Sequence, residues 1–95
     1  MQDAFWEWDD HKAERNAGDH DGVTFTEAQS VFQDPERVEL YDEAHSEEEG
    51  RFAAIGFSSK GRLLLVVFTP RGERTRLITA RTTERDEENI SEKGS

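Results

Sequence analysis

The sequence predicts one small α+β domain, in which an antiparallel meander sheet follows N-terminal helices and precedes a C-terminal helix. Three observations support this fold class. The chain has 95 residues, which suits a single domain spanning 1–95. Helix start signals stand at Asp9 or Asp10 and at Thr24, ahead of most of the strands. Residues 51–81 then contain three strand-like segments separated by two short turns.

The N-terminal segment predicts an edge strand followed by a first helix. Ala4–Trp8 is a short aromatic run, and we expect its alternation to bury either Trp6 or Trp8 and to expose the other. A helix is predicted over His11–Ala17, because either of the two preceding aspartates can accept from the amides of its first turn. Gly18 is expected to end this helix.

The second helix has a clearer start signal. Thr24–Glu27 fits a capping box, in which Thr24 caps the helix and Glu27 reaches back from the third helical position. Pro35 ends the helical segment, since proline disfavours helical geometry in the residue before it. The helix has one apolar face, which carries Phe25, Ala28 and Phe32.

Four further segments are predicted as strands. Arg37–Tyr41 alternates polar and apolar residues, which indicates a strand with one buried face. Residues 62–69 contain a continuous apolar run, as expected of a central strand covered on both faces. Strands over 51–58 and 74–81 flank it, with turns at 58–61 and 70–73. Within 74–81 the even positions are expected on one face and the odd positions on the other.

Two segments are expected to be less ordered than the sheet. Residues 43–50 form an acidic loop with three consecutive glutamates, which we expect to be mobile. Thr83 can cap a final helix, and the end of this helix is expected to fray over residues 92–95.

Charge is divided unevenly along the chain. Residues 1–50 carry 16 acidic and 3 basic side chains, whereas residues 51–81 carry 7 basic side chains and 1 acidic one. The whole chain has a formal net charge of −10. A basic block within an acidic protein indicates an anionic partner. Because the block coincides with the predicted meander, we expect its positive charge to lie on a sheet that holds RNA phosphates.

Composition argues against several classes of function. The chain has no Cys, and its three His lack the helical pairing of a zinc site, so we expect neither a metal nor a cofactor. No run reaches the ~18 apolar residues that cross a bilayer, and the start lacks a leader pattern, so we expect a soluble, cytoplasmic protein. Arg outnumbers Lys nine to three in an acidic composition. That pattern is typical of proteins from a high-salt cytoplasm, or of an ordinary acidic protein with a cationic partner.

The spacing of residues in both halves of the chain resembles that of BrnT-type toxins, over roughly residues 5–90. In the first half the shared positions are Phe5, Trp8, Asp9, Lys12, Ala13, Asn16, His20, Val23, Phe25, Glu27, Ala28, Phe32, Asp34 and Pro35. In the second half they are Arg51, Phe52, Ile55, Gly56, Ser58, Ser59, Gly61, Arg62, Val66, Val67, Thr69, Arg71, Gly72, Arg76, Ile78, Ala80 and Arg81.

This resemblance implies a RelE-like fold, ribonuclease toxicity and a cognate antitoxin that neutralises the toxin. It also implies that operator DNA is bound by the toxin–antitoxin complex. The sequence departs from the family pattern at Asp19, where the family usually has Lys, and at Pro70, where it often has Glu. One extra residue stands between Asp19 and Gly22, and the usually Arg-rich terminal helix is acidic over 83–93.

RNA cleavage without a metal needs a base for the 2′-hydroxyl, an acid for the leaving oxygen, and cations around the phosphate. His20 is the acid/base candidate because imidazole titrates near neutral pH, and its other interpretation is a turn residue. Lys12 is predicted to donate a proton or to contact the phosphate, and its other interpretation is a helix-surface charge. Asn16 is expected to orient backbone rather than to react.

Arginine suits the phosphate because its planar group pairs with two oxygens at once. We predict catalytic roles for Arg76 and Arg81, and RNA-binding roles for Arg51, Arg62 and Arg71. Any single one of these arginines is otherwise explained as a solvated strand-end residue or an antitoxin contact. Trp8 is predicted to stack on a base, or else to pack in the core.

Three functions follow from these features. The first is a toxin that cleaves RNA. The second is a catalytically weakened module, whose basic sheet receives an acidic antitoxin and which acts in operator autoregulation; Asp19 and the acidic C-terminal segment favour it. The third, a regulator that binds DNA alone, is disfavoured because the net charge is −10 and no basic recognition helix is present.

Overall fold

The fold was obtained as a computed structural model, which describes residues 1–42 and 50–83. Five strands form one sheet in the order β1-β5-β4-β3-β2. The strands are β1 (Trp6–Glu7), β2 (Val38–Tyr41), β3 (Phe52–Phe57), β4 (Leu63–Arg71) and β5 (Arg74–Thr82). The helices are α1 (Asp10–Asp19), α2 (Phe25–Ser30) and the 3₁₀ turn η1 (Val31–Gln33).

The predicted α+β class is therefore confirmed, with an antiparallel meander of β3, β4 and β5. The predicted edge strand is β1, which pairs in parallel with β5. Except for Gly50, the expected acidic loop over 43–50 lies outside the described residues. The expected C-terminal helix and the tail over 92–95 lie outside them as well.

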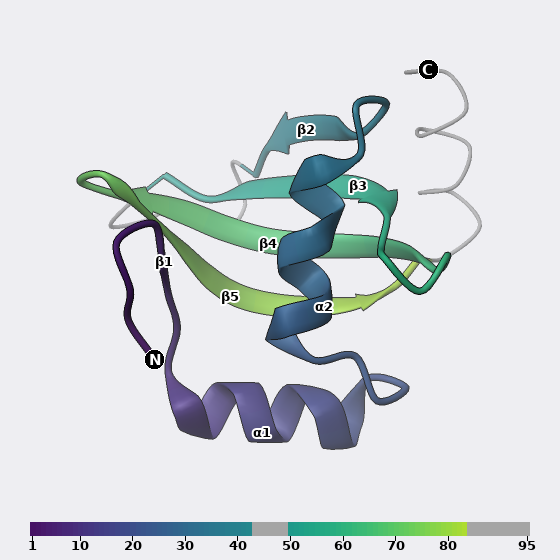
Figure 1. Ribbon diagram of the computed structural model, residues 1–95, viewed down its shortest axis with the longest axis horizontal. Coiled ribbons are helices and arrows are strands. Elements are labelled where there is room, and N and C mark those ends of the chain that lie inside the picture. Colours follow the sequence, from purple (N-terminus) through teal and green to yellow (C-terminus); the bar gives the residue numbers. More distant parts are fainter. Residues whose placement is uncertain (43–49, 84–95) are drawn as a thin grey trace.

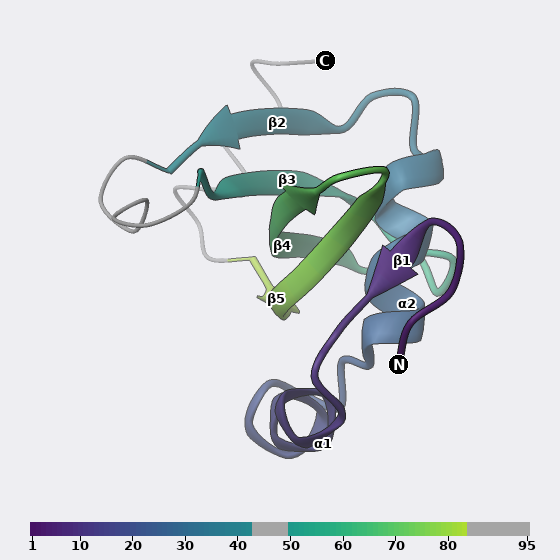
Figure 2. The ribbon, with the colours of Figure 1, turned by 90° about the vertical axis from the view of Figure 1, so that its left-hand side faces the viewer.

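The helices occupy two different positions relative to the sheet. Helix α2 crosses one face of the sheet, whereas α1 lies beyond β5 at the edge (Figure 1). The view turned by 90° shows the same arrangement, with α2 on one side of the strands and α1 below them (Figure 2). Within residues 1–42 and 50–83, no helix covers the opposite face of the sheet, which we call the open face.

Helix α1 begins at Asp10, one residue earlier than predicted, and ends two residues later than predicted, at Asp19. The carboxylate of Asp9 accepts from the backbone amide of Lys12 at 3.1 Å and so caps the first turn. The expectation that Gly18 ends the helix is wrong, because the helix continues to Asp19. The left-handed conformations that make the turn fall at Asp21, with φ 54°, and at Gly22, with φ 71°.

Helix α2 forms only half of the predicted capping box. The hydroxyl of Thr24 accepts from the amide of Glu27 at 3.0 Å, as expected. The carboxylate of Glu27 does not reach back to the helix start. It points instead to the turn between β3 and β4, where it accepts from Ser58 and Arg62.

The core lies between the sheet and α2. Its buried members are Val23, Phe25, Ala28, Val31, Ala54, Leu64, Val66, Phe68, Leu77 and Ala80. Both tryptophans pack against this core, so the expectation that one is exposed was wrong. Trp6 meets Phe32 edge to face at 5.2 Å, and Trp8 meets Phe25 in the same way at 5.7 Å. The reason is that residues two apart in a strand point to the same face.

Two strands are less covered than predicted. In β4, Leu64 and Val66 are buried beneath α2, but Leu65 and Val67 are only half-buried on the open face. The continuous apolar run is thus not covered on both faces by described residues. Strand β2 lies at the sheet edge, and the buried face expected for it is missing, since Leu40 is 40% exposed.

A β-bulge in β5 changes which residues share a face. Val67 is opposite Thr79 and Phe68 is opposite Leu77, so Ile78 is an extra residue. Leu77 and Ala80 are both buried toward α2 as a result, although the even/odd pattern predicted them on opposite faces. That prediction is wrong across the bulge, because one inserted residue reverses the alternation that follows it.

Candidate functional site

One buried side chain attaches α1 to β5. Strand β1 pairs with β5 only at Thr75 and Arg76, so the later part of β5 has no strand neighbour on that side among residues 1–42 and 50–83. Asn16 takes this place: its amide nitrogen donates to the carbonyls of Ala80 at 2.7 Å and Val23 at 2.8 Å. Its oxygen accepts from the Ala80 amide at 2.9 Å and the Thr79 hydroxyl at 3.0 Å. These four hydrogen bonds join α1 to the edge of β5 and to Val23.

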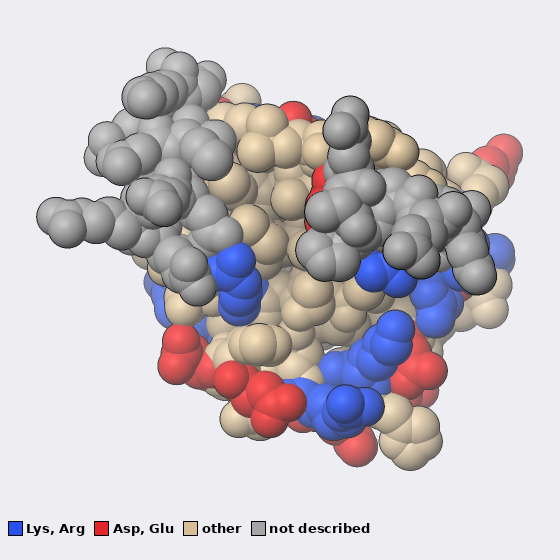
Figure 3. Space-filling model, turned by 180° about the vertical axis from the view of Figure 1, so that it is seen from behind, with Lys and Arg blue, Asp and Glu red and all other residues tan. Residues whose placement is uncertain are grey.

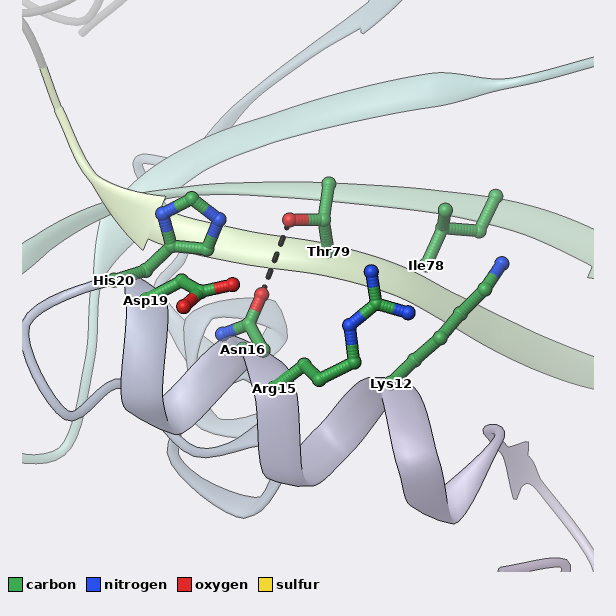
Figure 4. Close-up of a pocket in the computed structure, with 7 residues that line it drawn as sticks. All are labelled: Lys12, Arg15, Asn16, Asp19, His20, Ile78 and Thr79. Atoms are coloured by element: carbon green, nitrogen blue, oxygen red, sulfur yellow. Dashed lines mark hydrogen bonds between the residues drawn. The ribbon is translucent and has the colours of Figure 1, made fainter.

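The outer side of this junction is hollowed. A recess of about 180 Å³, which we call the helix recess, is lined by Lys12, Arg15, Asn16, Asp19, His20, Ile78 and Thr79. The cationic ends of Lys12 and Arg15 extend from α1 toward β5, and the His20 ring stands at the C-terminal end of the helix (Figure 4). Spacings of three and four residues place these side chains on one helical face.

A second hollow lies on the open face of the sheet. This sheet recess, of about 370 Å³, is lined by Asp42, Arg51, Ala53, Leu65, Val67, Ile78, Thr79 and Arg81. The open face shows basic groups around a hollow whose floor is uncharged (Figure 3). Ile78 and Thr79 line both recesses, so the two hollows meet at the bulge in β5.

The combined lining is more basic than acidic. Four cations stand around it, Lys12, Arg15, Arg51 and Arg81. Two carboxylates, Asp19 and Asp42, stand there as well. Among the described lining residues, this balance is opposite to that of the whole chain, whose net charge is −10, and a net positive lining attracts anions.

Arg62 lies elsewhere and stabilises the fold. Its guanidinium donates to both carboxylate oxygens of Glu27, including Nε to Oε2 at 3.0 Å, and also to the backbone carbonyl of Asp21 at 2.9 Å. Glu27 is 4% exposed, and Ser58 donates to it at 2.6 Å. The bonds from Arg62, followed by that from Ser58, hold the pKa of Glu27 below its ordinary value although burial opposes them.

The other predicted site residues are divided between the recesses and structural contacts. Lys12 and His20 line the helix recess, and Arg51 and Arg81 line the sheet recess. Arg76 donates to Glu7 at 2.9 Å, which ties β1 to β5 at their paired positions.

Arg71 and Trp8 do not line either recess. Arg71 is exposed at the last position of β4, beside the hairpin turn. Trp8 packs against Phe25, as described above. Sequence reasoning missed one cation of the lining, Arg15, although its position three residues after Lys12 in a predicted helix was a usable signal. It also missed the apolar lining of the sheet recess, which no motif marks.

A family model described as a ribonuclease toxin, BrnT, of type II toxin–antitoxin systems matches residues 8–87. The chain belongs to the BrnT toxin family. The matched segment includes every residue that lines the two recesses, and membership implies an antitoxin partner. No curated protein sequence matches the chain.

The fold of this BrnT-family protein is similar to that of a solved relative. The crystal structure of the Brucella abortus ribonuclease toxin BrnT matches with a TM-score of 0.66 and 21% sequence identity. The match covers 85% of this chain and 99% of the other. In the part of the BrnT-family chain that the structure describes, no helix is long and apolar enough to cross a membrane.

Proposed function

We propose that this protein is the toxin of a type II toxin–antitoxin pair and cleaves RNA internally without a metal ion. The observation that carries the proposal is the meeting of the two recesses at Ile78 and Thr79. Lys12 and His20 line the helix recess, the two arginines line the adjoining sheet recess, and we treat the two recesses together as one hollow. RNA is the substrate, and the cognate antitoxin neutralises the toxin by covering this hollow.

The chemistry is a transesterification within the RNA. A base takes the proton of the 2′-hydroxyl, and the resulting oxyanion attacks the adjacent phosphorus. The bond from phosphorus to the 5′-oxygen breaks, and an acid gives that oxygen a proton. The products are a 2′,3′-cyclic phosphate and a 5′-hydroxyl. His20 and Lys12 transfer the two protons, while Arg15 and Arg81 stabilise the charge that grows on the phosphate.

Two of the predicted arginines receive other roles in this proposal. Arg76 is bound to Glu7 and Arg62 to Glu27, and neither arginine lines a recess. We assign both to holding the sheet and α2 in place. Arg71 lies four residues beyond Val67 on β4, and we assign it to the flanking RNA rather than to the cleaved phosphate.

Cleavage by the purified protein in the presence of EDTA tests the proposal. We expect RNA fragments that end in a 2′,3′-cyclic phosphate, and a loss of rate of about 100-fold or more in Lys12→Ala and Arg81→Ala. Lys60→Ala is the matched control, because Lys60 is an exposed cation in the turn between β3 and β4 and lines neither recess. The assay is run in dilute and in concentrated KCl, since an acidic surface of this kind suits a high-salt cytoplasm. No cleavage in either buffer would refute the proposal.

The second candidate function is a weakened module that binds antitoxin and regulates the operator. Asp19 favours it, because this carboxylate lines the helix recess beside His20 and repels a phosphate. Asp19→Lys separates the two functions. If the wild-type protein does not cleave RNA and Asp19→Lys does, the weakened module is supported. If the wild-type protein arrests growth when its antitoxin is absent, the toxin is supported. In either case, operator DNA is bound by the toxin–antitoxin complex.

A further inference from the structure

The sheet recess has a feature that phosphate binding does not require. Its floor is formed by the apolar side chains of Ala53, Leu65, Val67 and Ile78. Leu65 and Val67 are half-buried, because the open face of β4 has no helix over it among the described residues. Cations that bind only phosphate can stand on a polar surface, so the apolar floor indicates a ligand with an apolar part.

We infer that the sheet recess is a base-binding subsite, in which one nucleobase of the RNA lies on the apolar floor between Arg51 and Arg81. This inference rests on the proposed function and deepens it. The cleaved phosphate lies where the two recesses meet, between the cations of the helix recess and Arg81 of the sheet recess, and the base belongs to a nucleotide attached to that phosphate. The two recesses share Ile78 and Thr79, so a base and its own phosphate can occupy them together.

Size, shape and charge all support a base as the occupant. A volume of about 370 Å³ is at the small end of ligand pockets and suits one nucleoside rather than a peptide segment. Unpaired bases bind proteins by stacking on flat apolar or guanidinium surfaces, and both kinds of surface are present here. The charged lining consists of two arginines and one carboxylate, Asp42, so its net positive charge favours a ligand that carries phosphates over a neutral apolar side chain of the antitoxin.

Methyl NMR of the wild-type protein tests the subsite directly. The probe is a dinucleotide whose attacking 2′-hydroxyl is replaced by hydrogen, so that it cannot be cleaved. An abasic form of the same dinucleotide is the control. We expect ring-current shifts at the methyl groups of Leu65, Val67 and Ile78 with the base-bearing probe and none with the abasic one. The methyl groups of Val66 and Leu77, buried toward α2, are the internal reference.

Affinity gives a second measurement. Stacking of one base should make the base-bearing probe bind about 5- to 150-fold more tightly than the abasic one. Leu65→Ala should reduce this advantage several-fold and leave the abasic probe unchanged. Leu63→Ala is the matched control, since Leu63 is also half-buried on the open face of β4 but lies outside the recess.

The outcomes separate the subsite from the proposed function. Cleavage of RNA with no ring-current shift at the three methyl groups, or with equal affinity for both probes, would overturn the subsite and leave the ribonuclease proposal standing. The recess would then be a pocket for the antitoxin. A protein that neither cleaves RNA nor shows these shifts would overturn both proposals.

Discussion

Replacing Asn16 with alanine should destabilise this protein more than any exposed substitution on α1. Asn16 is 5% exposed and uses all of its hydrogen-bonding capacity, two donors and two acceptor positions. In Asn16→Ala, the amide and carbonyl of Ala80 and the carbonyl of Val23 lose these partners. Both residues are fully buried, so water does not easily replace the asparagine.

The expected cost can be worked out from these three backbone groups. A buried polar group without a partner costs about 1–3 kcal/mol, so the sum is at least about 3 kcal/mol. For a domain of this size, each kcal/mol lowers the melting temperature by about 4–8 °C. Thermal unfolding followed by circular dichroism should therefore show a decrease of at least about 12 °C in Asn16→Ala. Glu14→Ala, an exposed change on the same helix, should stay within about 0.5 kcal/mol of the wild type.

Asn16→Asp examines the same contacts by charge. The introduced carboxylate keeps the acceptor but turns its second oxygen toward the carbonyls of Ala80 and Val23. Burial and these carbonyls raise the pKa of the introduced group, so its folded state favours the protonated form. Stability lost at neutral pH should thus be partly regained as the pH falls through that raised pKa. For Asn16→Ala itself, a melting temperature within 3 °C of the wild type would refute the prediction that the unpaired backbone groups of Ala80 and Val23 destabilise the fold.

Three further predictions concern other parts of the fold. Gly56→Ala should lower the free energy of unfolding by about 1–3 kcal/mol, because a Cβ there would lie 2.9 Å from the Cβ of Arg37. A Cβ added in Gly18→Ala meets nothing within 4 Å, so this control should raise the free energy of unfolding by up to about 1 kcal/mol. Urea unfolding measures both changes. Glu27→Gln should cost about 1–3 kcal/mol at neutral pH, since it removes the charge that Arg62 binds. The pKa of Glu27 is lowered in the folded protein, so the stability difference between wild type and Glu27→Gln should be fully present above the unfolded pKa of 4.5. It should vanish as the pH falls through the lowered pKa of the folded protein. A stability difference that stays unchanged in acid would contradict the pairing of Glu27 with Arg62. Phe32→Ala should lower the free energy of unfolding by about 3 kcal/mol, measured by thermal unfolding, because the ring contacts both Trp6 and Phe68. A loss below about 1 kcal/mol would show that these contacts do not stabilise the sheet.

The candidate site was predictable only in part. Lys12 and His20 were named from the sequence, and they do line one recess. The sequence pattern assigns the arginines of the basic block to RNA as one group, yet Arg62 pairs with Glu27, which is 35 positions away along the chain. The capping-box pattern predicts that Glu27 bonds to the start of its own helix, because this pattern considers only residues within one helical turn. A long-range ion pair depends on which segments the fold brings together, and a short stretch of sequence does not carry that information.

The sequence by itself determined the local elements of this protein. Alternating and continuous apolar runs specified the meander. The aspartates at positions 9 and 10 and Thr24 specified to within one residue where two helices begin, because these signals act over three or four residues. Only the tertiary structure decided which side chains meet. The bulge at Ile78 reverses the alternation in β5, and Asn16 joins α1 to the edge of that strand. The two hollows meet at this junction because side-chain direction depends on strand register and on long-range packing, which the spacing of residues does not encode.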